Sequence, residues 1–134
     1  MTFWTNQGYN ALKAERFAIK MRWNVIKANS LNIRSVTKSS GVYCFIKSQI
    51  VEGIKLNAKA LYVGKSKSIR SRLSQHLNHN KCHNHALLVD LIAQSKNETV
   101  EFHFTELPDS KIDQVERDLI SKLNPKHNIL LKGV

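Results

Sequence analysis

Acidic residues are scarce in this sequence, which has 10 Asp and Glu against 21 Lys and Arg and a formal net charge of +11 at pH 7. A positive excess of this size does not specify a fold, but it attracts polyanions, and nucleic acid is the leading candidate. No acid occurs between Lys65 and His83. We therefore expect nucleic acid to bind along this stretch. The alternative is a basic surface without a specific partner.

Cysteines and long apolar runs are also scarce. Cys44 and Cys82 are the two cysteines, too few for a disulfide framework, which favours a reducing, intracellular setting. No apolar run approaches the roughly 20 residues that cross a bilayer, and the first ten residues do not resemble a signal peptide. We expect a cytoplasmic protein outside the membrane, associated with the nucleoid when it binds DNA.

The N-terminal 38 residues carry seven Lys or Arg and one acid. Apolar residues follow a spacing of three or four residues, interrupted by Arg16, which predicts an amphipathic helix over 9–28; they are Tyr9, Leu12, Ile19, Trp23 and Ile26. We expect residues 1–38 to be a basic helical extension. It would cover a sheet, lie on DNA, or form the interface of a homodimer.

The remaining residues, 39–134, are expected to form one compact domain. Apolar and alternating patterns predict strands over 41–50, 59–64 and 98–107, and helical patterns predict helices over 65–78, 83–96 and 108–124. In the last strand, alternation predicts a single buried face. The order indicates an α/β (α+β) fold with a small three-stranded, mainly antiparallel sheet flanked by helices.

Three polar residues occupy positions next to apolar helix faces. Arg72 and His76 are four residues apart, so they point the same way from one helix. Glu116 borders the apolar face of the last helix, and a partly buried carboxylate needs a cation or a metal. One interpretation is an Arg72–Glu116 ion pair, and the other is an active site.

Two tyrosines strengthen the second interpretation. Tyr43 and Tyr62 lie in successive strands, close to Gly41 and Gly64. A phenol can relay a proton, while Arg and Lys can clamp a phosphate. One carboxylate can hold a divalent cation whose other ligands are water and phosphate oxygen. Together, Tyr, Arg, Lys, His and Glu would make a site that hydrolyses phosphodiesters.

These residues resemble the signature of the GIY-YIG nuclease family over residues 40 to about 131. "SGVYCF" contains the first half at Gly41-Val42-Tyr43, and "LYVGKSKSIRSRLSQH" contains the second at Tyr62-Val63-Gly64. Arg72 lies eight residues after Gly64, at the position of the family's arginine, and His76 matches a histidine of homing and restriction members.

The C-terminal segment "QVERDLISKLNPKHNILLKG" is also similar to this family. Glu116 falls at its metal-binding glutamate and Asn128 at its structural asparagine. Lys65 and the surrounding motifs look most like the incision modules of UvrC-type proteins. The resemblance implies a DNA endonuclease acting on double-stranded DNA, on a three-stranded sheet flanked by helices.

The resemblance also implies a mechanism. Glu116 would hold one Mg²⁺ or Mn²⁺, and Tyr43 would be the general base for the attacking water, helped by His76 or Lys65. An unperturbed tyrosine has a pKa of about 10, so nearby cations would have to favour its phenolate. Tyr62 would orient water or phosphate.

Other residues receive supporting roles from the same resemblance. Arg72 would clamp the scissile phosphate through its planar fork. Gly41, Gly64 and Asn128 would shape the wall of the site. The basic stretch would contact DNA through Lys67, Arg70, Lys81 and His83.

Two features depart from the family pattern. The loop "KSQIVEGIKLNAKA" between the first two strands is enlarged, and His76 stands where UvrC-like modules often carry Tyr. Different functions also stay open. The first is zinc binding by the cluster His79, Cys82, His83 and His85, but these crowd into seven residues without the separated pairs of common zinc sites, which favours a connecting loop. The others are a non-catalytic nucleic-acid-binding module on the same fold and a plain interaction protein.

Overall fold

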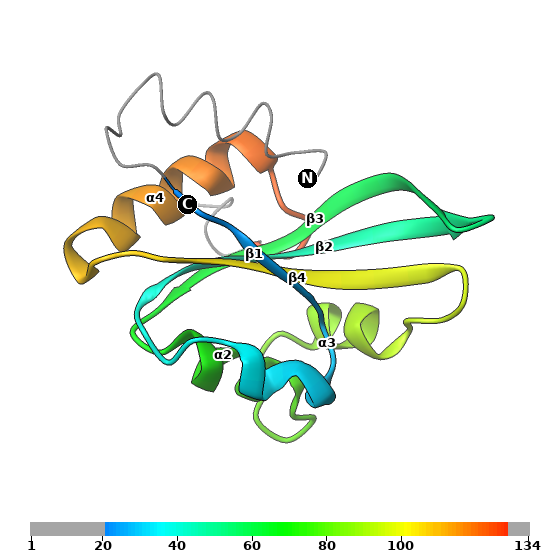
Figure 1. The fold of residues 1–134 in the computed structure, drawn as a ribbon, viewed down its shortest axis with the longest axis horizontal. Coiled ribbons are helices and arrows are strands. Elements are labelled where there is room, and N and C mark those ends of the chain that lie inside the picture. The colour runs from blue at the N-terminus through cyan, green and yellow to red at the C-terminus, as the bar shows by residue number, and fades with distance from the viewer. Residues whose placement is uncertain (1–20, 129–134) are drawn as a thin grey trace.

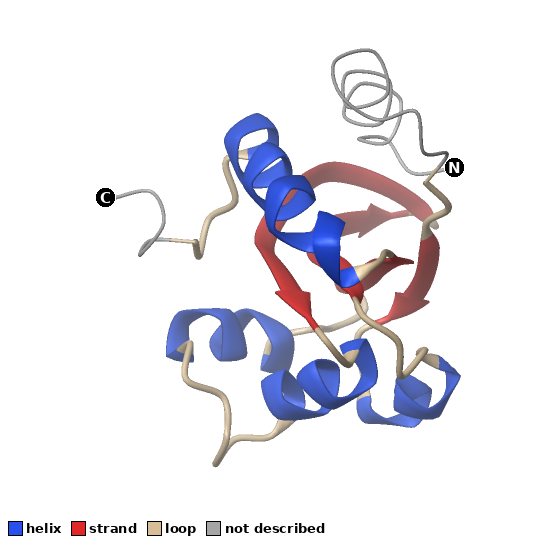
Figure 2. Cartoon of the chain, turned by 90° about the vertical axis from the view of Figure 1, so that its left-hand side faces the viewer, coloured by secondary structure: helices blue, strands red, loops and turns tan. Residues whose placement is uncertain are grey.

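The computed structural model describes residues 21–128 and contains one antiparallel sheet of four strands, in the order β1-β4-β2-β3. The strands are β1 (Asn24–Lys27), β2 (Gly41–Val51), β3 (Ile54–Ser66) and β4 (Glu98–Glu106). One face of the sheet carries α4 (Asp109–Leu123), and the other carries η1 (Ser30–Ser35), α2 (Ile69–Leu77) and α3 (His85–Ile92), as Figures 1 and 2 show. The predicted α/β fold is therefore confirmed, with one strand more than expected.

The additional strand is β1, and it corrects the helix predicted over 9–28. Asn24 to Lys27 pair with β4 from Phe104 to Glu101, and this strand covers an edge of the sheet. In this segment, pairing with the open edge of β4 outweighed the helical spacing of apolar residues. A free strand edge leaves backbone N–H and C=O groups unpaired, and β1 pairs those of β4. Residues 9–20 of the predicted helix lie outside the described residues.

The segment just before residue 39 also belongs to the packed structure. Ala28 and Val36, which flank η1, are 1% and 0% exposed and join the core on the η1, α2 and α3 face. A domain boundary at residue 39 therefore does not coincide with an edge of the core.

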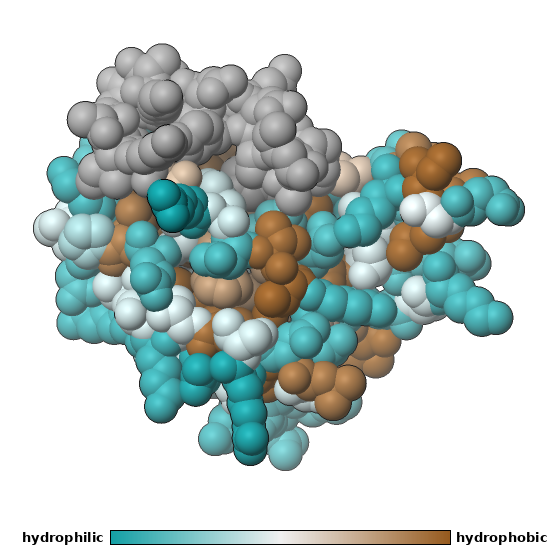
Figure 3. Space-filling view, in the orientation of Figure 1, coloured by the Kyte–Doolittle hydropathy of each residue, from teal (hydrophilic) through white to brown (hydrophobic). Residues whose placement is uncertain are grey.

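The enlarged loop between β2 and β3 is a continuous hairpin arm. Its turn is Glu52–Gly53, where both residues have positive φ, as two-residue hairpin turns that follow the strand twist require. Val51 and Ile54 pair beside the turn, and the ladder runs back to the domain with two irregularities. The arm projects past the helices (Figure 1), and Val51, Ile54 and Leu56 on it are exposed. Figure 3 shows apolar residues near the end of this arm.

Both faces of the sheet are buried because both carry helices. Along β2, Val42, Cys44 and Ile46 pack towards α4, whereas Tyr43 and Phe45 pack towards α2 and α3, as alternation along a strand dictates. The single buried face predicted for the last strand is wrong, because side chains on both faces of β4 are buried.

Two residues show the consequence for β4 and α3. His103 is 0% exposed although it lies on the supposedly solvated face, and burial lowers its pKa to about 4. Ile92, the last residue of α3, is 57% exposed although it is apolar, whereas Leu87 of the same helix is buried.

The helix boundaries follow local chemistry. Ser68 is the N-cap of α2, and its hydroxyl accepts a hydrogen bond from the Ser71 N–H. Asn124 ends α4 in the left-handed conformation, just before Pro125. Within residues 21–128 no helix is both long and apolar enough to cross a membrane.

Gly41 offers a test of this packing. A Cβ at this position would overlap the backbone carbonyl oxygen of Thr105 in β4 and lie 2.7 Å from Cδ1 of Ile69. Because the obstacle is backbone, Gly41→Ala should lower the free energy of unfolding by about 3 kcal/mol, measured by urea denaturation.

The matched control is Gly53→Asn at the tip of the arm. Gly53 has a φ of +78° but no atom within 4 Å of an added Cβ, and Asn tolerates this conformation. The control should change stability by less than about 1 kcal/mol. Equal losses from both substitutions would show that the close approach of β4 to Gly41 is not the constraint.

Candidate active site

A buried hydrogen bond between Tyr43 and His76 lies at the centre of the site. β2 directs Tyr43 towards α2, where the Tyr43 hydroxyl is 2.8 Å from Nε2 of His76. The His76 ring also lies 5.4 Å, centroid to centroid, from each of Phe45 and Tyr62. Burial, with a smaller effect from Arg72, lowers the pKa of His76 to about 4. His76 is therefore neutral at pH 7, and a neutral imidazole has one nitrogen that can accept the phenol's hydrogen bond.

The Tyr43 phenol is held in its protonated form. The residue is 0% exposed, and burial raises its pKa well above 10. The charge of Glu116 acts in the same direction, while Arg72 lowers the pKa both by its charge and as a hydrogen-bond donor. Burial has the largest effect on this pKa and outweighs the effect of Arg72. The phenolate that we expected nearby cations to favour is therefore not the favoured form.

Gly64 lets this phenol lie directly over the neighbouring strand. Tyr43 and Gly64 are cross-strand partners in the β2–β3 ladder. A Cβ on residue 64 would overlap the Tyr43 hydroxyl and lie 2.9 Å from Cε2 of Tyr62. The glycine therefore has a steric cause: the space of its side chain is taken by two tyrosines.

Glu116 enters the site from α4, on the opposite face of the sheet from His76. It is 9% exposed, and burial raises the pKa of its carboxyl group. Lys65, at the end of β3, has its Nζ 3.9 Å from Oε1 of Glu116 and also forms an ion pair with Asp113. Lys65, rather than Arg72, is thus the ion-pair partner of Glu116 among the described residues. The charge of Glu116 raises the pKa of both Tyr43 and Tyr62.

The donor set fits a hydrated divalent cation. Glu116 is a desolvated carboxylate whose lysine partner lies near the limit of an ion pair. Within residues 21–128, no three His, Cys, Asp or Glu side chains lie close enough together to hold a metal. One carboxylate suits Mg²⁺, which keeps several waters and accepts phosphate oxygens, whereas structural zinc needs four protein ligands.

Asn128 holds the backbone between Tyr62 and Gly64. Its Nδ2 donates to the Val63 carbonyl oxygen at 2.8 Å, and its Oδ1 accepts from the Val63 N–H at 2.9 Å. The neighbouring His127 N–H donates to the Leu61 carbonyl oxygen at 2.7 Å. The C-terminal segment therefore pairs with β3 as a short extra strand would, with the Asn128 amide in place of a peptide group.

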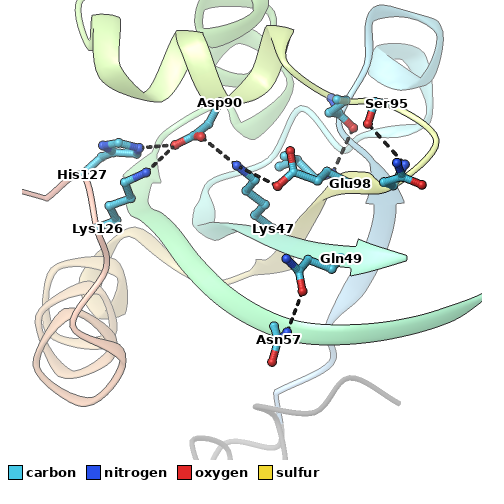
Figure 4. Close-up of polar contacts among 11 residues, drawn as sticks. Lys47, Gln49, Asn57, Asp90, Ser95, Glu98, Lys126 and His127 are labelled. Atoms are coloured by element: carbon cyan, nitrogen blue, oxygen red, sulfur yellow. Dashed lines mark hydrogen bonds and ion pairs between the residues drawn. The ribbon is translucent and has the colours of Figure 1, made fainter. Parts of the chain in front are cut away.

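Asp90 anchors this segment, and our sequence analysis missed it. Its carboxylate lies 2.6 Å from Nε2 of His127, 3.3 Å from Nζ of Lys126 and 3.1 Å from Nζ of Lys47 (Figure 4). Although burial opposes it, these partners together lower the pKa of Asp90. The signal was a single acid inside the apolar helix "HALLVDLI", since a buried carboxylate requires partners.

The four residues predicted to contact DNA have different environments. The guanidinium of Arg70 donates to the backbone carbonyl oxygens of Val36 at 2.7 Å and Arg34 at 2.9 Å, which ties α2 to η1. Lys67, Lys81 and His83 are exposed. The exposed residues can therefore meet a polyanion directly, whereas Arg70 already has backbone partners.

The paired tyrosines, the glycine beneath them and the glutamate of the last helix have the arrangement expected for a member of the GIY-YIG nuclease family. The family model of the UvrC-like GIY-YIG domain matches residues 39–129 of the sequence. The chain therefore belongs to this nuclease family, which confirms the resemblance found in the sequence. GIY-YIG nucleases generally depend on a divalent metal.

A curated relative is the UvrABC system protein C of Fusobacterium nucleatum subsp. nucleatum, which is 37% identical over 100 residues. The match covers 72% of this chain but 14% of that protein. No solved structure matches.

Desolvation of Glu116 predicts a cost in stability. Because its folded pKa is raised, the stabilising contribution is present at low pH and is lost as the pH rises through the folded pKa and the carboxyl group ionises. In EDTA at pH 7, Glu116→Gln should therefore raise the free energy of unfolding by roughly 0.5–1 kcal/mol. The gain should shrink as the pH falls towards 4, as followed by urea denaturation at each pH.

Glu106→Gln is the control, because Glu106 is exposed at the end of β4. It should leave stability unchanged within about 0.5 kcal/mol. If Glu116→Gln instead destabilises the protein at pH 7, the carboxylate is better compensated by Lys65 than its burial indicates.

Proposed function

We propose that the protein is an endonuclease that hydrolyses phosphodiester bonds of double-stranded DNA with the help of one Mg²⁺ or Mn²⁺. The observation that carries this proposal is the bond between the Tyr43 phenol and the neutral His76, with Arg72 and Glu116 both acting on the same phenol. A proton-transfer pair, a cation for phosphate and a carboxylate for metal are the parts that phosphodiester hydrolysis needs. DNA binding alone would not require buried groups such as Tyr43, His76 and Glu116.

Glu116 would hold the divalent ion, which when bound would neutralise charge on the phosphate and its leaving oxygen. Arg72 would leave the Tyr43 hydroxyl and bind the scissile phosphate through its fork. This movement would uncover a hydroxyl that has no exposed surface in the free protein. Water could then reach Tyr43 only when substrate is present.

Tyr43 would accept a proton from the attacking water while its own proton passes to Nε2 of His76 across 2.8 Å. Because the pKa of His76 is about 4, the imidazole would hold this proton only briefly. His76 lines an open cleft, which offers a path for the proton to solvent. Lys65 is already paired with Asp113 and Glu116, so His76 is the better supported helper. Tyr62, half-buried beside both, would orient the water or phosphate.

The positive charge of the protein indicates how it would bind DNA, and the single proposed active site per chain indicates how it would cut both strands. The basic surface would bind DNA in the cytoplasm, with Lys67 and Lys81 on phosphates and His83 also in contact with the DNA. One site cuts one strand per engagement, so a double-strand break would need a dimer or a second visit. We propose the N-terminal region as the interface of such a homodimer.

Cleavage of supercoiled plasmid tests the proposal. With Mg²⁺ or Mn²⁺ the wild-type protein should nick the plasmid, and EDTA should abolish this. Glu116→Gln should lose at least about 100-fold in rate because the metal's carboxylate ligand is gone, while the exposed control Glu106→Gln keeps full activity. A folded Glu116→Gln protein that still cleaves would refute the mechanism. DNA binding without cleavage by the wild type would favour a non-catalytic binding module.

Arg72→Lys separates a planar clamp from simple charge. Lysine keeps the positive charge but cannot offer two parallel donors to one phosphate, so the rate should fall by roughly tenfold or more. Arg34→Lys is the matched control, since Arg34 is exposed in η1. Single-turnover plasmid nicking provides the rates, and equal rates for Arg72→Lys and wild type would exclude bidentate clamping.

A further inference from the structure

A cleft of about 570 Å³ opens beside the catalytic tyrosines. Its walls are residues of α2, the segment that leads from α2 into α3, and the C-terminal residues that pair with β3. Its lining includes Tyr62, Arg72, Gln75, His76, His83 and His85. Concave sites that take small organic groups have volumes of roughly 300–1,000 Å³, so this cleft is large enough for part of a ligand.

The lining selects the chemistry of that ligand. No acidic residue lines the cleft, and Arg72 supplies its one permanent charge. Tyr62, His83 and His85 offer aromatic faces, and the two histidines are exposed and open to a ligand. The Gln75 amide contacts the Lys81 carbonyl oxygen at 3.4 Å, a long hydrogen bond that a better acceptor would replace. A flat, uncharged ring with polar edges, attached to a phosphate, fits these features.

The cleft is continuous with the catalytic residues. Tyr62, Arg72 and His76 belong to both, whereas Glu116 and Lys65 do not line the cleft. Tyr62 joins the two, since it lines the cleft and its ring lies 6.2 Å, centroid to centroid, from that of Tyr43. Burial raises the pKa of Tyr62, and the charge of Glu116 adds to this effect. A phosphate held by Arg72 would therefore have the metal site on one side and the cleft on the other. The group in the cleft would be the nucleotide next to that phosphate.

We propose that the cleft receives an unstacked nucleobase adjacent to the scissile phosphate, seated against Tyr62 and the imidazoles of His83 and His85, with Gln75 bonding its edge. The proposal rests on the nuclease function proposed above and specifies its substrate contact. Aromatic side chains bind bases with little regard to sequence because every base has a π-face. Such a pocket would position the strand for cleavage without reading a recognition sequence.

Base placement can be detected by fluorescence. After mapping a cut in a DNA duplex, 2-aminopurine is placed on either side of the cut phosphate, and the protein is added in EDTA. Unstacking should raise the fluorescence several-fold at one of the two positions with wild-type protein. The rise should disappear with the double variant His83→Ala/His85→Ala. His79→Ala is the control, since His79 is exposed on the same segment but does not line the cleft.

Cleavage rates then separate base binding from a structural role. An abasic site at the responsive position should lower kcat/KM of the wild type by about tenfold, the scale of one lost stacking contact. The double variant should show the same loss on the intact duplex and no further loss on the abasic one. Equal slowing on both duplexes would assign the histidines a structural role and overturn the proposal.

Two failures can be told apart. Glu116-dependent cleavage without any fluorescence change would overturn the base pocket and leave the nuclease function standing. A folded wild-type protein that cleaves neither plasmid nor duplex with Mg²⁺ or Mn²⁺ would overturn both.

Discussion

The close approach of the Tyr43 phenol to the backbone at Gly64 is the contact around which the site is built. It requires the β2–β3 register that pairs these residues, and a shift of one position would turn Tyr43 towards α4. It also requires that residue 64 has no side chain, since a Cβ would overlap the phenol. With the phenol in place, α2 supplies His76 at hydrogen-bond distance. Register, glycine and helix position are therefore one linked constraint.

The ionisable groups of the site are poorly solvated in the free protein, and a bound substrate and metal would compensate for this cost. Burial raises the pKa of both Tyr43 and Glu116 and lowers that of His76, so each group is desolvated in the free protein. Buried ionisable groups are costly because the interior solvates charge poorly. An active site tolerates this cost where a charged ligand completes it. The core on both faces of the sheet supplies the stability that such an arrangement needs.

The C-terminal segment connects distant parts of the chain to the tyrosines. Asn128 fixes the backbone of Val63, and His127 beside it is held by Asp90 of α3. Lys47 of β2 shares the same carboxylate. The result is that α3, β2 and the C-terminal residues all restrain the strand end that carries Tyr62 and Gly64. The same segment forms part of the wall of the cleft, so the restraint and the proposed base pocket share residues.

The sequence by itself determined most of the local elements and the family to which the chain belongs. Two half-signatures, an arginine eight residues later and a glutamate on the last helix were enough for the family, because those spacings depend on strand alternation and helix periodicity. Only the tertiary structure decided the rest. β1 formed a strand because β4 had an open edge, and His103 was buried although the alternation along β4 predicts a solvated face there. Three features depend on residues far apart in the chain: the contacts of Asp90, the ion pair of Lys65 with Glu116, and the cleft. Such long-range contacts leave no periodic pattern in the sequence.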